Sequence, residues 1–283
     1  MSTRGTIGFV VNKEAKLCYN HSDSYPSWMG VHTLGFLREF LKENDVSELR
    51  RQAGEIRVVS DEGSPATPEE IARLRPYSNF HVHSYSVSGP PGGVLPTENV
   101  AWYMLLRETQ GDWKLILEVG LMEDGSSFPL DSLFCEWAYV IDLDASTPQV
   151  EIYEGFQEKL PKKGRWAGSP TAAENKKSHE EHLKWCAAEG RDPWLPLVPK
   201  YKAVELVATY PLGDLPSDEA FLADVDPPDE LTELWKWSEY GDKAVSLRNA
   251  RARKLRKRGY VVKCSTQELS ADLVASVLEA VRS

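Results

Sequence analysis

The sequence lacks the segments that mark membrane-spanning, secreted and zinc-stapled proteins. No uninterrupted apolar run approaches the roughly 18 residues of a membrane-spanning helix, and the first residues have no basic-then-apolar signal pattern. The 4 cysteines are scattered and none lies at CxxC spacing, which argues against a disulfide framework or a zinc knuckle. We therefore expect a cytoplasmic protein of a reducing compartment, with no membrane partner.

Basic residues are also few compared with acidic ones. The chain carries 33 Lys and Arg against 43 Asp and Glu, a formal charge of −10, which argues against a whole-protein affinity for nucleic-acid phosphates. With 41% hydrophobic and 10% aromatic residues, the 283-residue chain has the composition of a folded globular protein. It contains no complete catalytic motif, and we expect no cofactor.

Two pairs of extended segments predict β-hairpins. Residues 6–11 are apolar and β-branched, residues 12–16 are polar, and residues 17–20 resume an extended pattern. Residues 134–143 and 149–156 repeat this arrangement around a short turn.

Helical patterns alternate with these strands. Apolar residues recur at helical spacing over residues 27–43, and Thr67, Pro68 and Glu70 form a capping box for a short helix. Further elements are expected as helices over residues 97–107 and 171–188, and as strands within 51–60 and over 201–210. The prediction is an α+β fold over residues 1–215, with a mixed or antiparallel sheet and flanking helices.

The chain changes character at residue 216. Residues 217–242 carry nine acidic side chains and one lysine, whereas residues 243–263 carry nine basic side chains and no acidic one. We predict a helical C-terminal appendage over residues 216–283, with attraction between its two segments. Its basic stretch includes Arg251, Lys254 and Arg258, which are candidates to contact nucleic-acid phosphates. The acidic segment is an alternative partner, so nucleic acid is not the favoured ligand.

The densest group of reactive side chains comes after the first hairpin, where the sequence reads Tyr-Asn-His-Ser-Asp-Ser-Tyr-Pro over residues 19–26. His21 and Asp23 could orient one another for proton transfer, with Asn20 or helix N–H groups stabilising an oxyanion. In the alternative interpretation, Asp23 or Ser24 caps the next helix and the neighbouring tyrosines cover the core edge.

These motifs resemble an uncharacterised protein family found in actinobacteria and their phages. The resemblance rests on Thr-Arg-Gly at residues 3–5, on residues 19–26, on FCEWAYVIDLD at residues 134–144, and on YEGFQ at residues 153–157. It covers roughly residues 1–215 and implies a shared domain with a site at these motifs. It implies no particular reaction.

The layout of the N-terminal part also resembles the N-terminal nucleophile hydrolases, including the choloylglycine hydrolases. Removal of Met1 would expose Ser2, and Asn20 and Asp23 come after the first hairpin as an Asn-x-x-Asp-like segment does in that group. The resemblance implies that the free α-amino group of Ser2 acts as base for its own hydroxyl. Serine stands here where cysteine or threonine is more usual.

Further candidates lie in the second hairpin and among the aromatic residues. Alternation along a strand places Cys135 and Glu136 on opposite faces, and an inward Glu136 would need Arg4 or His21 as a partner. The remaining candidates are the aromatic side chains expected to line a substrate pocket: Tyr19, Tyr25, Trp28 and Tyr139.

Two pairs of histidines could supply imidazoles to a metal ion. His81 and His83 share one face of an expected strand, and His179 and His182 share one face of an expected helix. Neither pair matches a HExxH motif, so surface or packing histidines are the default and no metal site is assigned.

Three functions from different classes remain. The first is a hydrolase of amide-like bonds, acting on a small-molecule or peptide-like substrate with a site built from the N-terminus and residues 20–25. The second is a non-catalytic module that binds a protein partner, in the phage or host-defence context that the family resemblance implies. The third is a nucleic-acid-associated protein. The sequence favours them in that order and leaves the oligomeric state open.

Overall fold

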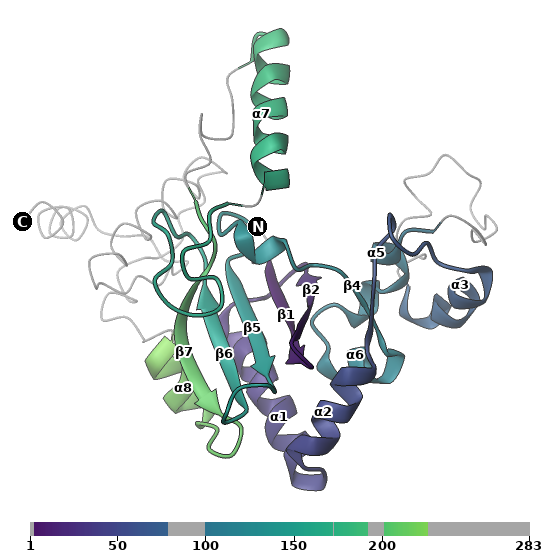
Figure 1. Ribbon diagram of the computed structural model, residues 1–283, viewed down its shortest axis with the longest axis vertical. Coiled ribbons are helices and arrows are strands. Elements are labelled where there is room, and N and C mark those ends of the chain that lie inside the picture. The colour runs from purple at the N-terminus through teal and green to yellow at the C-terminus, as the bar shows by residue number, and fades with distance from the viewer. Residues whose placement is uncertain (1–2, 79–99, 172, 192–200, 226–283) are drawn as a thin grey trace, which may run out of the picture. The chain divides into compact units, whose positions relative to one another are not determined.

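The computed structural model describes residues 3–78, 100–171, 173–191 and 201–225 (Figure 1). The chain divides into two compact units, Met1–Asp218 and Glu219–Ser283. The described elements belong to the first unit, apart from the short helix α8 (Asp218–Val225), which begins at the boundary. The predicted α+β class is confirmed, because the described residues form helices and a mixed sheet.

The main sheet has the strand order β2-β1-β5-β6-β7. Its members are β1 (Gly5–Val11), β2 (Glu14–Asn20), β5 (Trp137–Asp142), β6 (Gln149–Glu154) and β7 (Glu205–Pro211). Strands β1 and β5 run parallel and the other neighbours run antiparallel. Both predicted hairpins are therefore present, and they meet where β1 pairs with β5.

The first hairpin turns more tightly than the sequence predicts. Asn12 and Lys13 form its two-residue loop with φ values of 56° and 67°, a conformation whose twist matches that of paired strands. The carboxylate of Asp144 accepts the backbone N–H groups of both residues, at 3.2 and 2.6 Å. This support lets β2 begin at Glu14, three residues earlier than expected.

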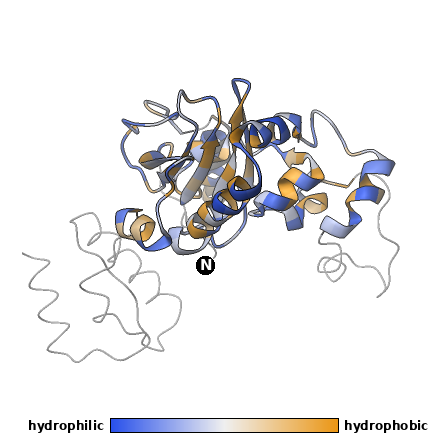
Figure 2. Ribbon diagram, turned by 90° about the horizontal axis from the view of Figure 1, so that it is seen from below, coloured by the Kyte–Doolittle hydropathy of each residue, from blue (hydrophilic) through white to orange (hydrophobic). Residues whose placement is uncertain are grey.

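Helix α1 (Val31–Glu43) comes after a π-helical turn at Pro26–Gly30 and packs on the sheet. Its inner face buries Leu34, Phe36 and Leu37. The ring of Phe36 stacks on Trp113 at 5.8 Å, and Trp113 meets Phe9 edge-on at 5.2 Å. Apolar residues accordingly concentrate in the strands and along one side of the helices (Figure 2).

The short strand expected within residues 51–60 is confirmed as β3 (Arg57–Val59), whereas helix α2 (Val46–Glu55), which precedes it, was not predicted. The side chain of Asp45 accepts the backbone N–H of Glu48 and caps the helix, and Leu49 and Ala53, four residues apart, form its buried stripe. Two buried residues in ten give a helical pattern too weak to recognise in sequence.

A second, two-stranded sheet pairs β3 with β4 (Leu121–Glu123) in parallel, and β4 lies beside β2 (Figure 1). The capping box at Thr67 is confirmed and starts α3 (Pro68–Leu74). The other elements of this region are η2 (Arg75–Tyr77), α5 (Trp102–Leu105), η3 (Arg107–Thr109), α6 (Trp113–Val119) and η4 (Phe128–Leu130). The helix expected over residues 97–107 is thus a short α5 that precedes a 3-10 turn.

Helix α7 spans Ala173–Ala188, close to the predicted 171–188. Among the described stretches, no helix has the length and apolar character needed to cross a membrane. The predicted helices after residue 225 lie outside the described residues.

Candidate functional site

The loop after β2 is held rigidly by its own side chains. Asn20 is buried, and its Nδ2 donates to the Ser22 carbonyl at 2.6 Å and to Ser24 Oγ at 2.7 Å. The backbone N–H of Ser24 donates to the Thr3 carbonyl at 3.0 Å, which ties the loop to the start of the chain. Asn20 therefore shapes the loop that begins after it.

Tyr139 supports the same loop from within the sheet. Its side chain is fully buried, and its hydroxyl donates to the Ser24 carbonyl at 2.9 Å. The side chain that the sequence placed against a substrate is therefore in the core, where it positions residues 20–24.

His21 lies between two phenol groups from different parts of the chain. Its Nδ1 is 3.1 Å from the hydroxyl oxygen of Tyr19, on β2, and 3.5 Å from that of Tyr103, on α5. The Tyr19 ring packs edge-on against Phe128 at 4.9 Å, which fixes its hydroxyl beside the imidazole. The site thus combines Tyr19 and His21, which the sequence analysis singled out, with Tyr103 from about eighty positions further along the chain.

Two arginines flank this group. Arg4 comes directly before Gly5, whose register partner Asn20 directly precedes His21, and the Arg4 guanidinium sits over the Phe134 ring at 5.2 Å. Arg107 sits over the Tyr103 ring at 5.5 Å and donates to Gln110 Oε1. Within the described part of the chain, neither guanidinium forms a salt bridge with a carboxylate.

The electrostatics keep His21 neutral. Partial burial lowers the pKa of His21 below its ordinary 6.5, and the positive charges of Arg107 and Arg4 lower it further. Burial raises the pKa of Tyr19, with the nearby Tyr103 adding to the rise and the two arginines opposing it. At neutral pH the cluster therefore presents an unprotonated imidazole and a protonated phenol between two cations.

Of the other predicted site residues, Asp23, Tyr25 and Trp28 are exposed to solvent, and Glu136 is half-buried. Asp23 is exposed, with a φ of 55°, and the groups beside His21 Nδ1 are phenols rather than this carboxylate. Glu136 is half-buried, and its backbone N–H donates to the Arg4 carbonyl at 2.9 Å. Tyr25 and Trp28 are exposed by 37% and 60%, before and on the π-helical turn.

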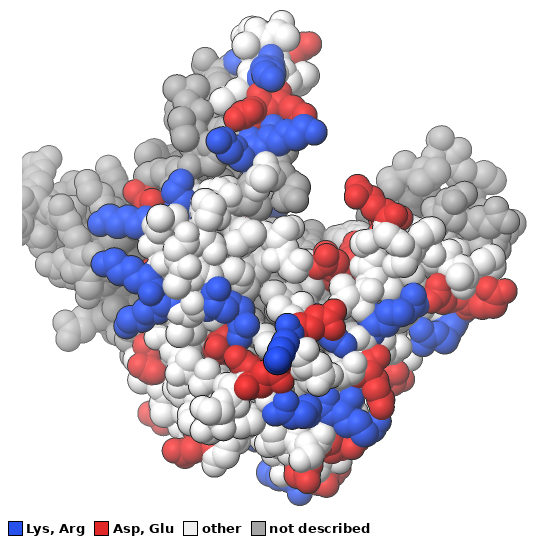
Figure 3. Space-filling model, viewed as in Figure 1, with Lys and Arg blue, Asp and Glu red and all other residues white. Residues whose placement is uncertain are grey.

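Several predicted residues lie outside the described residues. They are Ser2, His81, His83, Arg251, Lys254, Arg258 and the side chain of His179. Over the ranges that are described, no three His, Cys, Asp or Glu side chains are grouped so as to hold a metal ion. On the face drawn in Figure 3, acidic and basic side chains are intermixed.

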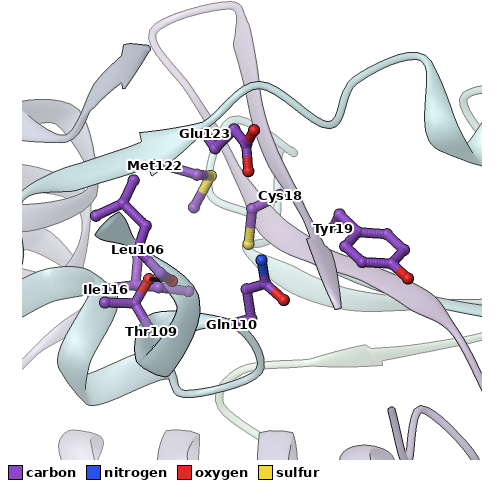
Figure 4. A pocket seen from close by; sticks show the side chains of 8 residues that line it. All are labelled: Cys18, Tyr19, Leu106, Thr109, Gln110, Ile116, Met122 and Glu123. Carbon is purple, nitrogen blue, oxygen red and sulfur yellow. Dashed lines mark hydrogen bonds between the residues drawn. The ribbon is translucent and has the colours of Figure 1, made fainter. Parts of the chain in front are cut away.

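A small cavity lies behind Tyr19. It is lined by Cys18, Tyr19, Leu106, Thr109, Gln110, Ile116, Met122 and Glu123, and its volume of about 10 Å³ is room for about one water molecule. The side chains of Cys18, Gln110 and Glu123 converge there, while the Tyr19 ring points away from them (Figure 4).

The ionisable groups of this cavity have shifted pKa values. Burial, with help from Asp61 and Asp124, raises the pKa of Glu123 to about 7. Burial, with help from Glu123, raises the pKa of Cys18 to about 12, so this thiol stays protonated and is not a ready nucleophile.

A cysteine and a histidine also meet on α7. The Sγ of Cys186 is 3.4 Å from Nε2 of His182, one helical turn away, and the cysteine is buried. From the sequence His182 was a candidate only for metal binding, although its spacing of four residues from Cys186 was the signal for this pair.

Sequence reasoning missed Tyr103 and Arg107. They are spaced four residues apart within a helical pattern, and nothing local links them to the loop after β2. No protein-family model matches the chain, and no match was found among curated proteins or solved structures.

Proposed function

We propose that the protein is a hydrolase of amide-like bonds and that His21 is its general base. The observation that carries the proposal is the contact of His21 Nδ1 with the hydroxyls of Tyr19 and Tyr103, beside Arg4 and Arg107. A neutral imidazole held by hydrogen bonds, with cations close by, has the composition of an acid–base site.

The chemistry depends on which nitrogen carries the proton. When Nδ1–H donates to the Tyr19 oxygen, Nε2 has a lone pair that accepts a proton from the attacking water or hydroxyl. The oxygen then bonds to the carbonyl carbon, and the negative charge on the carbonyl oxygen is stabilised by a guanidinium or phenol donor. Collapse breaks the C–N bond as the imidazolium returns its proton to the leaving nitrogen.

The nucleophile in this proposal is either water or the Ser2 hydroxyl. In the Ser2 route the free α-amino group takes the hydroxyl proton and returns it to the leaving nitrogen, so that His21 stays neutral and does not act as the base. The variant Ser2→Ala, together with an N-terminally extended form, separates the two routes. Loss of activity in both supports Ser2, and full activity in both assigns the nucleophile to water.

The test of the proposal is turnover of a panel of amide substrates by His21→Gln. We expect kcat/KM to fall about 10²- to 10⁴-fold, the usual contribution of general acid–base catalysis. His32→Gln is the matched control, because His32 is an exposed histidine on α1. Activity that survives His21→Gln, or that falls equally in His32→Gln, would contradict the proposal.

A second candidate, a protein-binding module, is favoured by the exposure of Trp28 and Tyr25, at 60% and 37%. Exposed aromatic side chains are common anchors in protein interfaces. The test is a stable, co-purifying partner that Trp28→Ala releases and Trp185→Ala retains, since Trp185 is also exposed, at 47%, on α7. Absence of any such complex removes this candidate.

A further inference from the structure

Arg4 and Arg107 reach the His21 site from different parts of the fold. Arg4 and His21 are the residues next to the last register pair of the first hairpin, Gly5–Asn20, while Arg107 begins η3, just after α5. Arg107 lies over the ring of Tyr103, whose hydroxyl is 3.5 Å from His21 Nδ1, and the charges of both arginines act on His21 and Tyr19.

Aromatic rings hold these guanidinium groups without neutralising them. The Cζ atom of Arg4 lies over the Phe134 ring at 5.2 Å and that of Arg107 over the Tyr103 ring at 5.5 Å, and contact with a ring face uses none of the N–H donors of a guanidinium. Among the described residues, Gln110 is the acceptor for one N–H of Arg107, and no carboxylate pairs with either arginine. Glu136, whose backbone N–H donates to the Arg4 carbonyl, forms no salt bridge with the Arg4 guanidinium among the described residues.

Arg4 and Arg107 are two positive charges in a protein whose net charge is −10, so their sign is opposite to that of the molecule as a whole. A guanidinium that is oriented but not paired with a carboxylate is well suited to bind the oxygens of a carboxylate or phosphate through two parallel hydrogen bonds. The half-buried position of both arginines strengthens such bonds compared with bonds on open surface.

We infer that the substrate of this site carries an oxyanion group, a carboxylate or a phosphate, which binds between Arg4 and Arg107 beside His21. The inference rests on the proposed function, because it names the group that the hydrolase recognises in its substrate. Arg4 and Arg107 are then substrate-binding residues, and His21 faces the bond next to the bound anion.

Equilibrium binding of inorganic phosphate and of succinate, measured separately by titration calorimetry on the full chain, tests the inference without any turnover. Arg4→Gln and Arg107→Gln are each expected to weaken binding about tenfold, as loss of one charge-assisted contact does. Arg75→Gln, which removes an exposed arginine on η2, should leave the affinity unchanged. Arg107→Lys, which keeps the charge, should lie between the native protein and Arg107→Gln.

Phosphate binding alone or succinate binding alone, with this pattern of variants, supports the inference and identifies the anion. Binding of neither anion, or binding that both glutamine variants leave intact, overturns it. The two proposals fail separately. If anions bind but turnover is independent of His21, the hydrolase assignment fails; if turnover requires His21 but no anion binds, the anion site fails.

Discussion

Two arginine clusters in the same domain differ in how their charge is met. The guanidinium of Arg165 donates to Glu151 Oε2 at 2.9 and 3.0 Å and to Asp142 Oδ2 at 2.9 Å. The hydroxyl of Tyr153 adds a bond to the same Glu151 oxygen at 2.7 Å. Around His21, by contrast, the guanidinium groups of Arg4 and Arg107 meet aromatic rings.

The difference separates a structural use of arginine from a ligand-binding one. Two carboxylates surround Arg165, whose side chain is only 21% exposed, and the cluster ties the segment after β6 to the sheet. The Arg165 guanidinium is already paired with carboxylates, so it has little to offer a ligand. Among the described residues Arg4 and Arg107 have no such carboxylate; burial lowers the pKa of His21, their charges lower it further, and those charges favour the approach of an anion.

The largest effect is expected when the matched cluster is broken. Arg165→Met leaves Glu151 buried without its cation, and we expect a loss of about 3 kcal/mol in the free energy of unfolding. Urea unfolding monitored by tryptophan fluorescence measures it. Arg51→Gln, which removes an exposed arginine of α2, should leave the midpoint unchanged. Equal midpoints for the two variants would contradict the structural role of Arg165.

A smaller loss is expected from Asn20→Ala, which removes the two hydrogen bonds that hold the loop carrying His21. We expect a loss of about 2 kcal/mol in the free energy of unfolding, together with reduced activity, because His21 is the next residue along that loop. The control is Asn44→Ala, whose exposed amide donates to the Phe40 carbonyl at 3.2 Å and should contribute less. If Asn20→Ala unfolds like Asn44→Ala, the Asn20 amide does not hold the loop.

Two carboxylates of the domain differ in the same way. Glu151 has a cation beside it, whereas Glu123 lies near two other acidic residues, Asp61 and Asp124. The folded-state pKa of Glu123, about 7, is above its ordinary 4.5, so the folded protein holds a proton that the unfolded chain loses. Stability should therefore fall as pH rises from about 4.5 to 7 and level off above that.

Glu123→Gln removes this dependence. Because the carboxyl is partly exposed and solvent screens it, we expect the variant to be only about 1 kcal/mol more stable than the native protein at pH 8. At about pH 4.5 the two should unfold alike. Urea midpoints measured at both pH values check this, and a native protein that gains stability relative to the variant as the pH rises would contradict it.

Local signals predicted much of the fold. Alternating apolar residues with polar turns indicated both hairpins, and the capping box at Thr67 indicated the start of α3. Helix α2 was missed because Leu49 and Ala53 are its only fully buried residues. The parallel pairing of β1 with β5 joins segments more than a hundred residues apart, which no local pattern encodes.

The candidate site, like the fold, was predicted only in part from the sequence. Tyr19 and His21 stand out because reactive side chains gather between a strand and a helix. Tyr103 and Arg107 join them only through tertiary packing. The pattern of a strand also cannot tell which of its faces will be covered, so Tyr139 was expected at a pocket and lies in the core.

The most direct test of the central claim is the proton NMR titration of the His21 imidazole, assigned with His21→Gln, in the native protein and in Arg107→Gln. Among the described residues, the groups that act on this ring include Arg4 just before β1, Tyr19 from β2, Tyr103 from α5 and Arg107 from η3. We predict a His21 pKa below 6.5 in the native protein and a higher one in Arg107→Gln, because a positive charge beside the ring is removed. Arg75→Gln should leave the value as it is. A native pKa at or above 6.5 that Arg107→Gln does not move would contradict the claim that unmatched arginine charge surrounds His21.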